Sequence, residues 1–114
     1  RNPELTFMMQ CVDEVDHLDK KITIQVFRVI QECLTNINRH AKASSVKINL
    51  SIRPQPDRLI LSVSDDGQGC LPENVSSGFG LLGMKERIKS LEGDFKIQSQ
   101  PGKGMKINAE IPIE

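Results

Sequence analysis

The sequence predicts an α+β fold, a two-layer α/β sandwich in which a mixed, mostly antiparallel five-stranded sheet carries helices on one face. The first observation is the order of elements, which reads strand, helix, two strands, helix, two strands. The others are a helical stripe over residues 23–41 and strict apolar alternation over 46–52. At 114 residues the chain has the size of one ordinary domain, so we expect a single unit over residues 1–114.

The N-terminal part predicts a strand, a loop and a helix. Residues 5–12 form an apolar-rich stretch short enough for a buried strand, and the polar residues 13–21 predict a loop. Over residues 23–41 apolar side chains recur at three- and four-residue intervals, as in an amphipathic helix, and Thr23 can cap its start. The stripe consists of Val26, Phe27, Ile30, Cys33, Leu34, Ile37 and Ala41.

Two pairs of strands and a second helix complete the predicted fold. Proline- and glycine-containing turns separate the members of each pair, which indicates hairpins. We expect strands at 46–52 and 59–64, a glycine-containing loop at 65–80, a helix at 81–91 that ends at Gly93, and strands at 95–99 and 105–111.

Composition restricts the classes of partner. Lys plus Arg and Asp plus Glu both number 15, so there is no net field to attract nucleic acid, and no nucleic-acid partner is expected. The cysteines Cys11, Cys33 and Cys70 are widely spaced and odd in number, which fits neither a disulfide framework nor a zinc site. No apolar run approaches the roughly 18 residues of a membrane-crossing helix. Because the chain begins with Arg1, we expect a fragment of a longer protein.

Three polar side chains form a row on the first predicted helix. Glu32, Asn36 and His40 stand four residues apart, so each is rotated by only about 40° from the last and all three share one side. With Ile30 as the middle of the apolar stripe, this row falls along its flank, away from the core. By itself, such a row is typical of the solvated side of an amphipathic helix.

Two glycine-containing segments have the composition of a ligand site. Asp65-Asp66-Gly67-Gln68-Gly69 follows a strand, where a carboxylate can accept a hydrogen bond from an amino group on a ring and glycines let that ring approach the backbone. Gly78-Phe79-Gly80-Leu81-Leu82-Gly83-Met84 runs into a helix, whose N–H groups can face phosphate. The pair Gly102 and Gly104 precedes the last strand. Alone, the first segment is equally typical of an acidic turn, and the second lacks the Lys-Ser/Thr ending of a Walker loop.

In order and spacing, these segments together resemble the ATP-binding domain of sensor histidine kinases, within the family that also includes gyrase-type ATPases, mismatch-repair ATPases and heat-shock chaperones. The resemblance covers about residues 22–113. The run Phe27-Arg28-Val29-Ile30-Gln31-Glu32, followed by Asn36, Arg39-His40-Ala41 and Ala43-Ser44, is similar to the subgroup of nitrate, hexose-phosphate and membrane-fluidity sensors. It implies a Bergerat-type ATP-binding fold.

The resemblance implies roles for the row on the first helix, with ATP and Mg²⁺ as cofactors. Glu32 matches the general base that polarises the attacking group, and Asn36 matches the Mg²⁺ ligand. Arg39 and His40 match positions that approach the phosphates and the ribose. For His40 the alternative is a solvent-facing residue at a helix end.

The resemblance also assigns the glycine segments to the nucleotide pocket. Asp65 matches the carboxylate that reads the adenine amino group. The family usually has threonine after the last glycine, Gly104, whereas this chain has Met105, so we expect adenine contact through Asp65 with weaker affinity. The remaining assignments are Gly67 and Gly69 to the adenine pocket, and Gly78, Gly80 and Leu81 to the box that closes over the phosphates.

The implied function is phosphoryl transfer from Mg-ATP to a histidine on the dimerisation domain of the same sensor, with relay to a response regulator. His17 lies in a polar loop without the helical acidic surroundings of such an acceptor, so we expect the chain not to label itself. The full-length protein is expected to be a homodimeric bacterial sensor, held at the inner membrane by segments outside this chain, with this domain in the cytoplasm.

Two alternatives stay open at the level of sequence. An anti-sigma-type serine kinase or a switch ATPase of the same family would share the pocket, and an upstream helical hairpin with a histidine beside acidic residues would distinguish the histidine kinase from it. A degenerate nucleotide-binding module would have lost the chemistry. The presence of Glu32 and Asn36 argues against that module.

Overall fold

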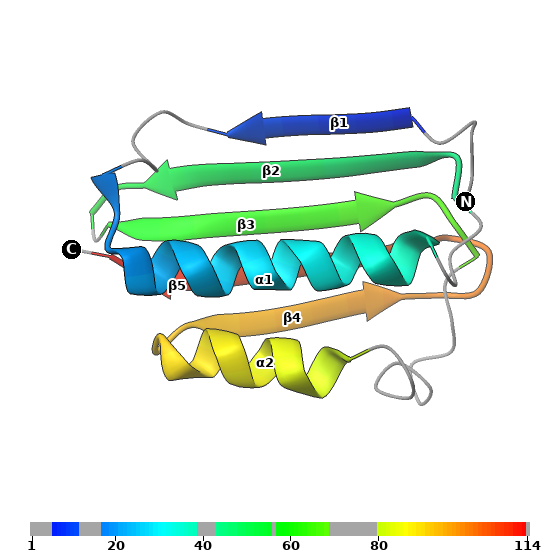
Figure 1. The fold of residues 1–114 in the computed structure, drawn as a ribbon. Helices are drawn as coiled ribbons and strands as arrows, with labels where there is room; N and C mark the ends of the chain where they lie inside the picture. The colour runs from blue at the N-terminus through cyan, green and yellow to red at the C-terminus, as the bar shows by residue number, and fades with distance from the viewer. Residues whose placement is uncertain (1–5, 12–16, 39–42, 56, 69–79, 114) are drawn as a thin grey trace.

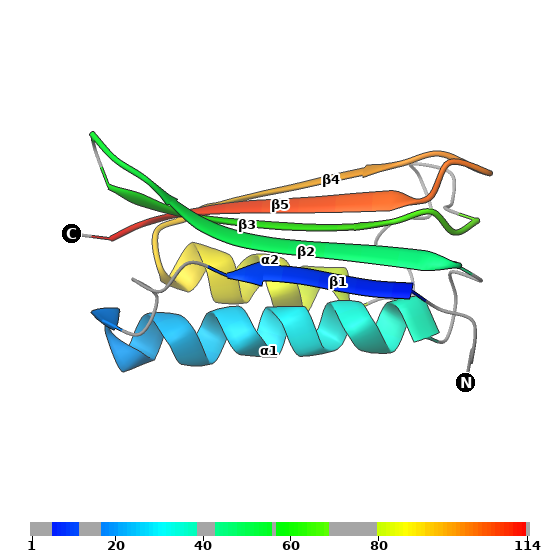
Figure 2. The ribbon, with the colours of Figure 1, turned by 90° about the horizontal axis from the view of Figure 1, so that it is seen from above.

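The computed structural model describes residues 6–11, 17–38, 43–55, 57–68 and 80–113. Five strands form one sheet, and two helices lie together on one of its faces (Figures 1 and 2). The predicted α+β sandwich is therefore confirmed. The elements are β1 (Thr6–Cys11), α1 (Lys20–Asn36), β2 (Ser45–Arg53), β3 (Arg58–Asp65), α2 (Leu81–Ser90), β4 (Asp94–Ser99) and β5 (Met105–Pro112).

The sheet has the order β1-β2-β3-β5-β4. β1 runs parallel to β2, and the three other pairings are antiparallel, which confirms the mostly antiparallel sheet and both predicted hairpins. The pairing of β3 with β5 joins the two hairpins and sets Asp65 opposite Met105. Two segments that the sequence analysis assigned to one pocket are thus neighbours in the sheet.

One core lies between the helices and the sheet. Alternate residues of β2, β3 and β5 face the helices and are buried, as the period of two in a strand requires. The helices contribute the apolar sides of their amphipathic patterns. Side chains that are almost wholly buried include Val26, Val29, Cys33, Ile48, Leu50, Leu59, Leu61, Met84, Ile88 and Ile111.

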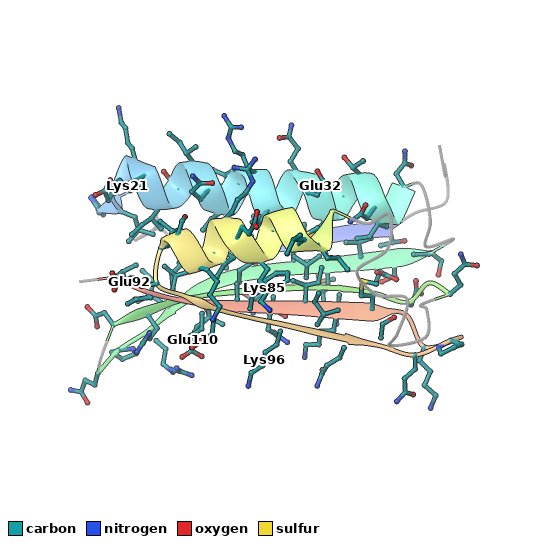
Figure 3. All side chains as sticks on the ribbon, turned by 90° about the horizontal axis from the view of Figure 1, so that it is seen from below. Lys21, Glu32, Lys85, Glu92, Lys96 and Glu110 are labelled. Carbon is teal, nitrogen blue, oxygen red and sulfur yellow. The ribbon has the colours of Figure 1, made fainter. Side chains whose placement is uncertain are left out.

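The opposite face of the sheet carries polar side chains. Lys96 and Glu110 point away from the helices on this face (Figure 3). Arg53 donates to Glu110 Oε1 at 2.7 Å near the end of the sheet remote from Asp65. Neither helix in the described part of the chain is long and apolar enough to cross a membrane.

The first strand differs from its prediction. We expected a buried strand, but the described side chains of β1 are exposed, with Met8 at 50% and Met9 at 43%. β1 is an edge strand that pairs only with β2, whereas both helices lie toward the opposite edge of the sheet, near β5 and β4 (Figure 1). An apolar run does not reveal whether a strand will be central or at an edge.

The start of α1 also differs. The helix begins at Lys20, inside the predicted loop, and Asp19 caps it by accepting a hydrogen bond from Lys21 N at 2.8 Å. Thr23 is not the cap, since its hydroxyl donates to Lys20 O within the first turn. The first turn is polar, so the apolar stripe begins later than the helix does. The predicted end at Ala41 lies outside the described residues.

Candidate functional site

The two described members of the polar row lie one turn apart on α1. Glu32 is half-buried, and Asn36 has only 8% of its surface exposed, the one polar side chain to fall among the buried residues in the described part of the chain. We expected both to lie away from the core. For Glu32 the difference arises because α2 packs beside α1, where Cys33 Sγ lies 3.8 Å from Met84 Sδ. Arg39 and His40 lie outside the described residues.

The start of α2 lies against Glu32. Gly80 is the N-cap of α2 and has a left-handed backbone with φ of 65°. A Cβ at this position would lie 2.7 Å from Glu32 Oε2, so the carboxylate lies directly against Gly80, and the left-handed backbone favours glycine there. Leu81 follows as the first helical residue and has a buried side chain, so only its backbone is available to a ligand. Gly78 lies outside the described residues.

The end of β3 is held by glycines on two sides. Gly67 N donates to Asp65 Oδ1 at 2.8 Å. Gly104 has φ of 75°, and a Cβ there would collide with the backbone oxygen of Asp65. These contacts fix both the backbone and the half-buried carboxylate of Asp65. The remaining glycine of this segment, Gly69, lies outside the described residues.

The pKa values of Asp65 and Cys33 indicate that the end of β3 lies near α1. Burial raises the pKa of Asp65, and the neighbouring charge of Asp66 raises it further, while backbone hydrogen bonds from Gly67 and Met105 act in the opposite direction. Burial also raises the pKa of Cys33 to about 12, with additional contributions from the negative charges of Glu32 and Asp65. Both carboxylates therefore act on the same sulfur atom. Gly80, Glu32, Asp65 and Gly104 lie around one region of the molecule.

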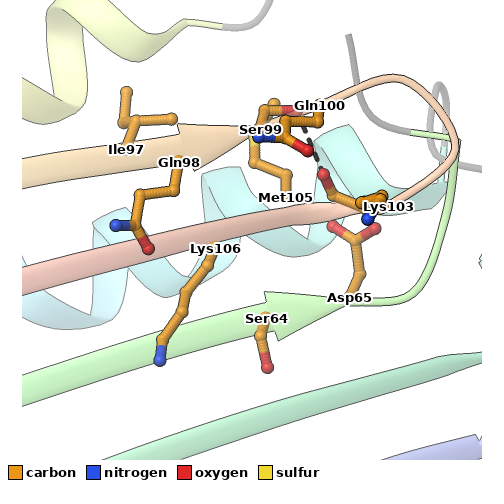
Figure 4. A pocket seen from close by; sticks show the side chains of 10 residues that line it. Ser64, Asp65, Ile97, Gln98, Ser99, Gln100, Lys103, Met105 and Lys106 are labelled. Carbon is orange, nitrogen blue, oxygen red and sulfur yellow. Dashed lines mark hydrogen bonds between the residues drawn. The ribbon is translucent and has the colours of Figure 1, made fainter.

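A cavity of about 760 Å³ lies at the end of β3 and beside the turn between β4 and β5 (Figure 4). Asp65, Gly104 and Met105 line it together with Lys103 and residues of β4. Ser99 Oγ donates to Gly104 O at 3.1 Å and steadies the turn between β4 and β5. Glu32, Asn36 and Gly80 do not line this cavity, so it adjoins only one end of the predicted site.

Sequence reasoning missed the part that Asp66 plays. Its carboxylate accepts three hydrogen bonds, from Ser44 N at 2.8 Å, Ser44 Oγ at 2.7 Å and Ser45 N at 2.9 Å. These hydrogen bonds lower the pKa of Asp66. The available signal was a serine pair at the start of one strand and a second carboxylate at the end of its antiparallel neighbour.

Most of the chain matches one known protein family. Residues 21–114 match the model of the histidine kinase-, DNA gyrase B- and HSP90-like ATPases. The chain belongs to this family. The predicted resemblance to the ATPase domain of sensor histidine kinases is confirmed, and the family description implies ATP as the nucleotide.

Several curated relatives of this ATPase-family chain are bacterial sensor kinases. It is 36% identical over 99 residues to the signal transduction histidine-protein kinase/phosphatase DegS of Brevibacillus brevis, covering 86% of this chain and 25% of the relative. It is 38% identical over 97 residues to the sensor histidine kinase LiaS of Bacillus subtilis, covering 84% and 26%. The chain thus spans about a quarter of the length of these relatives.

Solved structures share the fold of this family member. A blue-light activated histidine kinase, Erythrobacter litoralis EL346, superposes with a TM-score of 0.81 at 20% identity, over 98% of this chain and 36% of that one. The Acinetobacter baumannii histidine kinase AdeS gives 0.74 at 20% identity, over 97% and 55%. At this identity the likeness concerns the arrangement of the sheet and helices.

The described residues of the ATPase domain fit the adenine end of ATP. Asp65 offers an acceptor for an exocyclic amino group, and Gly67 N and the close approach of Gly104 to its backbone hold it in place. In the described part of the chain, no group of three or more His, Cys, Asp and Glu side chains is placed to hold a metal.

Gly104→Ala tests the close approach at the end of β3. Because its Cβ would collide with the backbone of Asp65, we expect a loss of about 3 kcal/mol or more in the free energy of unfolding. Gly102→Ala is the matched control, since Gly102 also has a positive φ but nothing within 4 Å of its Cβ, and should cost about 1 kcal/mol. Urea unfolding measures both. Equal losses would contradict the close-approach argument.

Asp65→Asn tests the cost of the half-buried carboxylate. The pKa of Asp65 is raised in the folded state, so ionisation opposes folding once the pH rises through that pKa. We expect Asp65→Asn to be more stable than the wild type at about pH 7, with the gain shrinking as the pH falls and disappearing below the unfolded pKa of about 3.9.

Asp66→Asn is the control, because the pKa of Asp66 is shifted in the opposite direction from that of Asp65. The pKa of Asp66 is lowered, so its contribution to stability is present at neutral pH and is lost as the pH falls through the folded pKa. This variant should be less stable than the wild type at about pH 7. Urea unfolding at several pH values between about 3 and 7 measures the stability of both variants relative to the wild type. An Asp65→Asn protein that is less stable than the wild type at neutral pH would refute the prediction for Asp65.

Proposed function

We propose that the chain binds Mg-ATP beside α1, the end of β3 and the start of α2, and donates the γ-phosphate to a histidine on the dimerisation domain of the sensor to which it belongs. The phosphate then passes to a response regulator. The observation that supports this most directly is the placement of Glu32 against Gly80 and of Asp65 against Gly104, with both carboxylates near enough to Cys33 to raise its pKa. Segments far apart in the sequence thereby supply an adenine acceptor, a base and a helix start to one region.

At the adenine end, Asp65 accepts a hydrogen bond from the amino group of the base. Its raised pKa reflects the free-energy cost of a carboxylate that is half-buried, and such a cost is typical of functional positions. Gly67 and Gly104 shape the space beside it, and Gly69 completes this side. Met105 has a thioether where the family usually has a hydroxyl, so Asp65 provides the side-chain hydrogen bond to adenine.

At the phosphate end, backbone N–H groups after Gly80 face the phosphates at the N-terminus of α2, where the helix dipole favours anions. Gly78, Leu81, Arg39 and His40 complete this end. Asn36 would hold Mg²⁺, which would supply positive charge to neutralise the phosphates. Glu32 accepts the proton of the attacking imidazole as its nitrogen bonds to the γ-phosphorus and the bond to the leaving ADP oxygen breaks.

The acceptor histidine belongs to another domain in this proposal. His17 precedes α1, whereas Asn36 is the last residue of that helix, so the two are on the order of 25 Å apart along its axis. No phosphate held near Asn36 can reach His17 within one chain. The partners are therefore the dimerisation domain and the response regulator, in a homodimeric protein whose membrane attachment lies in other segments.

Magnesium-dependent nucleotide binding tests the role of Asn36. We expect Asn36→Ala to lose at least about tenfold in affinity for a fluorescent ATP analogue with Mg²⁺, and to change little without it. Asn38→Ala is the matched control, because Asn38 is exposed and lies two residues further along. Equal affinities of the two variants in the presence of Mg²⁺ would contradict the assignment of the metal ligand.

The proposal also predicts binding without self-labelling. After incubation with Mg²⁺ and ATP radiolabelled at the γ-phosphate, the chain should carry no acid-labile phosphate on His17, because that residue lies a helix length from Asn36. Titration of the same sample must show ATP binding. Label that disappears in His17→Ala would overturn the assignment of the acceptor to another domain.

A further inference from the structure

The carboxylate of Asp66 accepts three hydrogen bonds from the polypeptide itself. Oδ1 accepts from the backbone N–H groups of Ser44 and Ser45, and Oδ2 accepts from the Ser44 hydroxyl, all at 2.7 to 2.9 Å. In addition, Asp66 N donates to Ser45 O at 3.2 Å. Hydrogen bonds to an ionised acceptor are stronger than neutral ones, so this set fixes the position of the residue. Through these bonds Asp66 anchors the end of β3 to the start of β2.

Ser44 connects this anchor to a third strand. Its backbone oxygen accepts from Thr6 N at 2.7 Å, while its own N–H and hydroxyl donate to Asp66. The start of β1, the start of β2 and the end of β3 therefore meet at one residue. Ser44 and Asp66 directly adjoin the ends of β2 and β3, so the anchor is tied to the sheet.

The residue before the anchor is Asp65, whose carboxylate is the proposed adenine acceptor. On one side, the bonds to Ser44 and Ser45 hold the backbone that follows Asp65. On the other side, Gly104 packs so closely that a Cβ there would lie 3.2 Å from Asp66 Cα. The peptide between Asp65 and Asp66 is thus held between β2 and the turn before β5. Gly67 N then reaches back to Asp65 Oδ1 at 2.8 Å.

We propose that Asp66 is a positioning residue, which holds the turn after β3 so that the carboxylate of Asp65 meets the amino group of adenine and rejects guanine. This inference rests on the proposed nucleotide function and deepens it. Guanine carries a carbonyl oxygen where adenine carries the amino group, and two acceptors facing each other repel. The selectivity for ATP over GTP therefore depends on how firmly Asp65 is held, whereas general binding of the triphosphate does not.

The test compares the dissociation constants of ATP and GTP, each with Mg²⁺. Asp66→Ala removes all three bonds to the carboxylate, and we expect the preference for ATP to fall about tenfold while GTP affinity changes little. Asp66→Asn keeps an acceptor for the two backbone N–H groups and should retain the preference within about threefold. Ser44→Ala removes one bond only and should give an intermediate loss, which keeps the test valid if Asp66→Ala does not fold.

Glu110→Ala is the matched control for a lost charge-assisted bond. It removes the 2.7 Å contact with Arg53 at the other end of the sheet, so it should change neither nucleotide affinity. A purely structural role of Asp66 would lower both affinities by the same factor and leave the preference unchanged, which would overturn this inference alone. A wild-type chain that binds no ATP would overturn the proposed function and, with it, the role of Asp66.

Discussion

The antiparallel pairing of β3 with β5 is the constraint on which the candidate site depends. It joins two hairpins that are each formed by neighbouring segments, and it brings the turn before β5 against the end of β3. The approach of these backbones is so close that only glycine fits at position 104. Without this pairing, Asp65 would end an isolated hairpin, and the half-buried environment that raises its pKa would not exist.

The contact between α1 and α2 sets the other half of the site. Cys33 and Met84 pack in the core, and Arg87 Nη1 donates to Gln25 Oε1 at 2.8 Å further along the two helices. This packing turns the side of α1 that carries Glu32 and Asn36 toward α2 and away from bulk water. A carboxylate and an amide are thereby held beside a helix start, in surroundings that favour directed interactions over solvation.

Local patterns predicted the hairpins, both helices and the glycine turns, because each depends on residues close together in the chain. The exposure of β1 and the burial of Asn36 were not predictable, since both depend on which elements become neighbours in space. The bonds between Asp66 and Ser44 need the register of β2 against β3, which composition does not encode. The resemblance supplied roles for Glu32 and Asp65, and the fold brings both near Cys33 without testing those roles.

The position of β1 has a consequence for the dynamics of the domain. The chain between β1 and its partner β2 includes the whole of α1. Bringing these two strands together therefore costs more chain entropy than closing either hairpin. In exchange, its described side chains bury little surface. Local opening in proteins begins where few apolar contacts offset such a cost, so we expect β1 to be the first strand to detach under thermal fluctuation. The pairing of β3 with β5 does not involve this strand, so Asp65 stays opposite Met105 when β1 opens, while Ser44 loses its bond to Thr6.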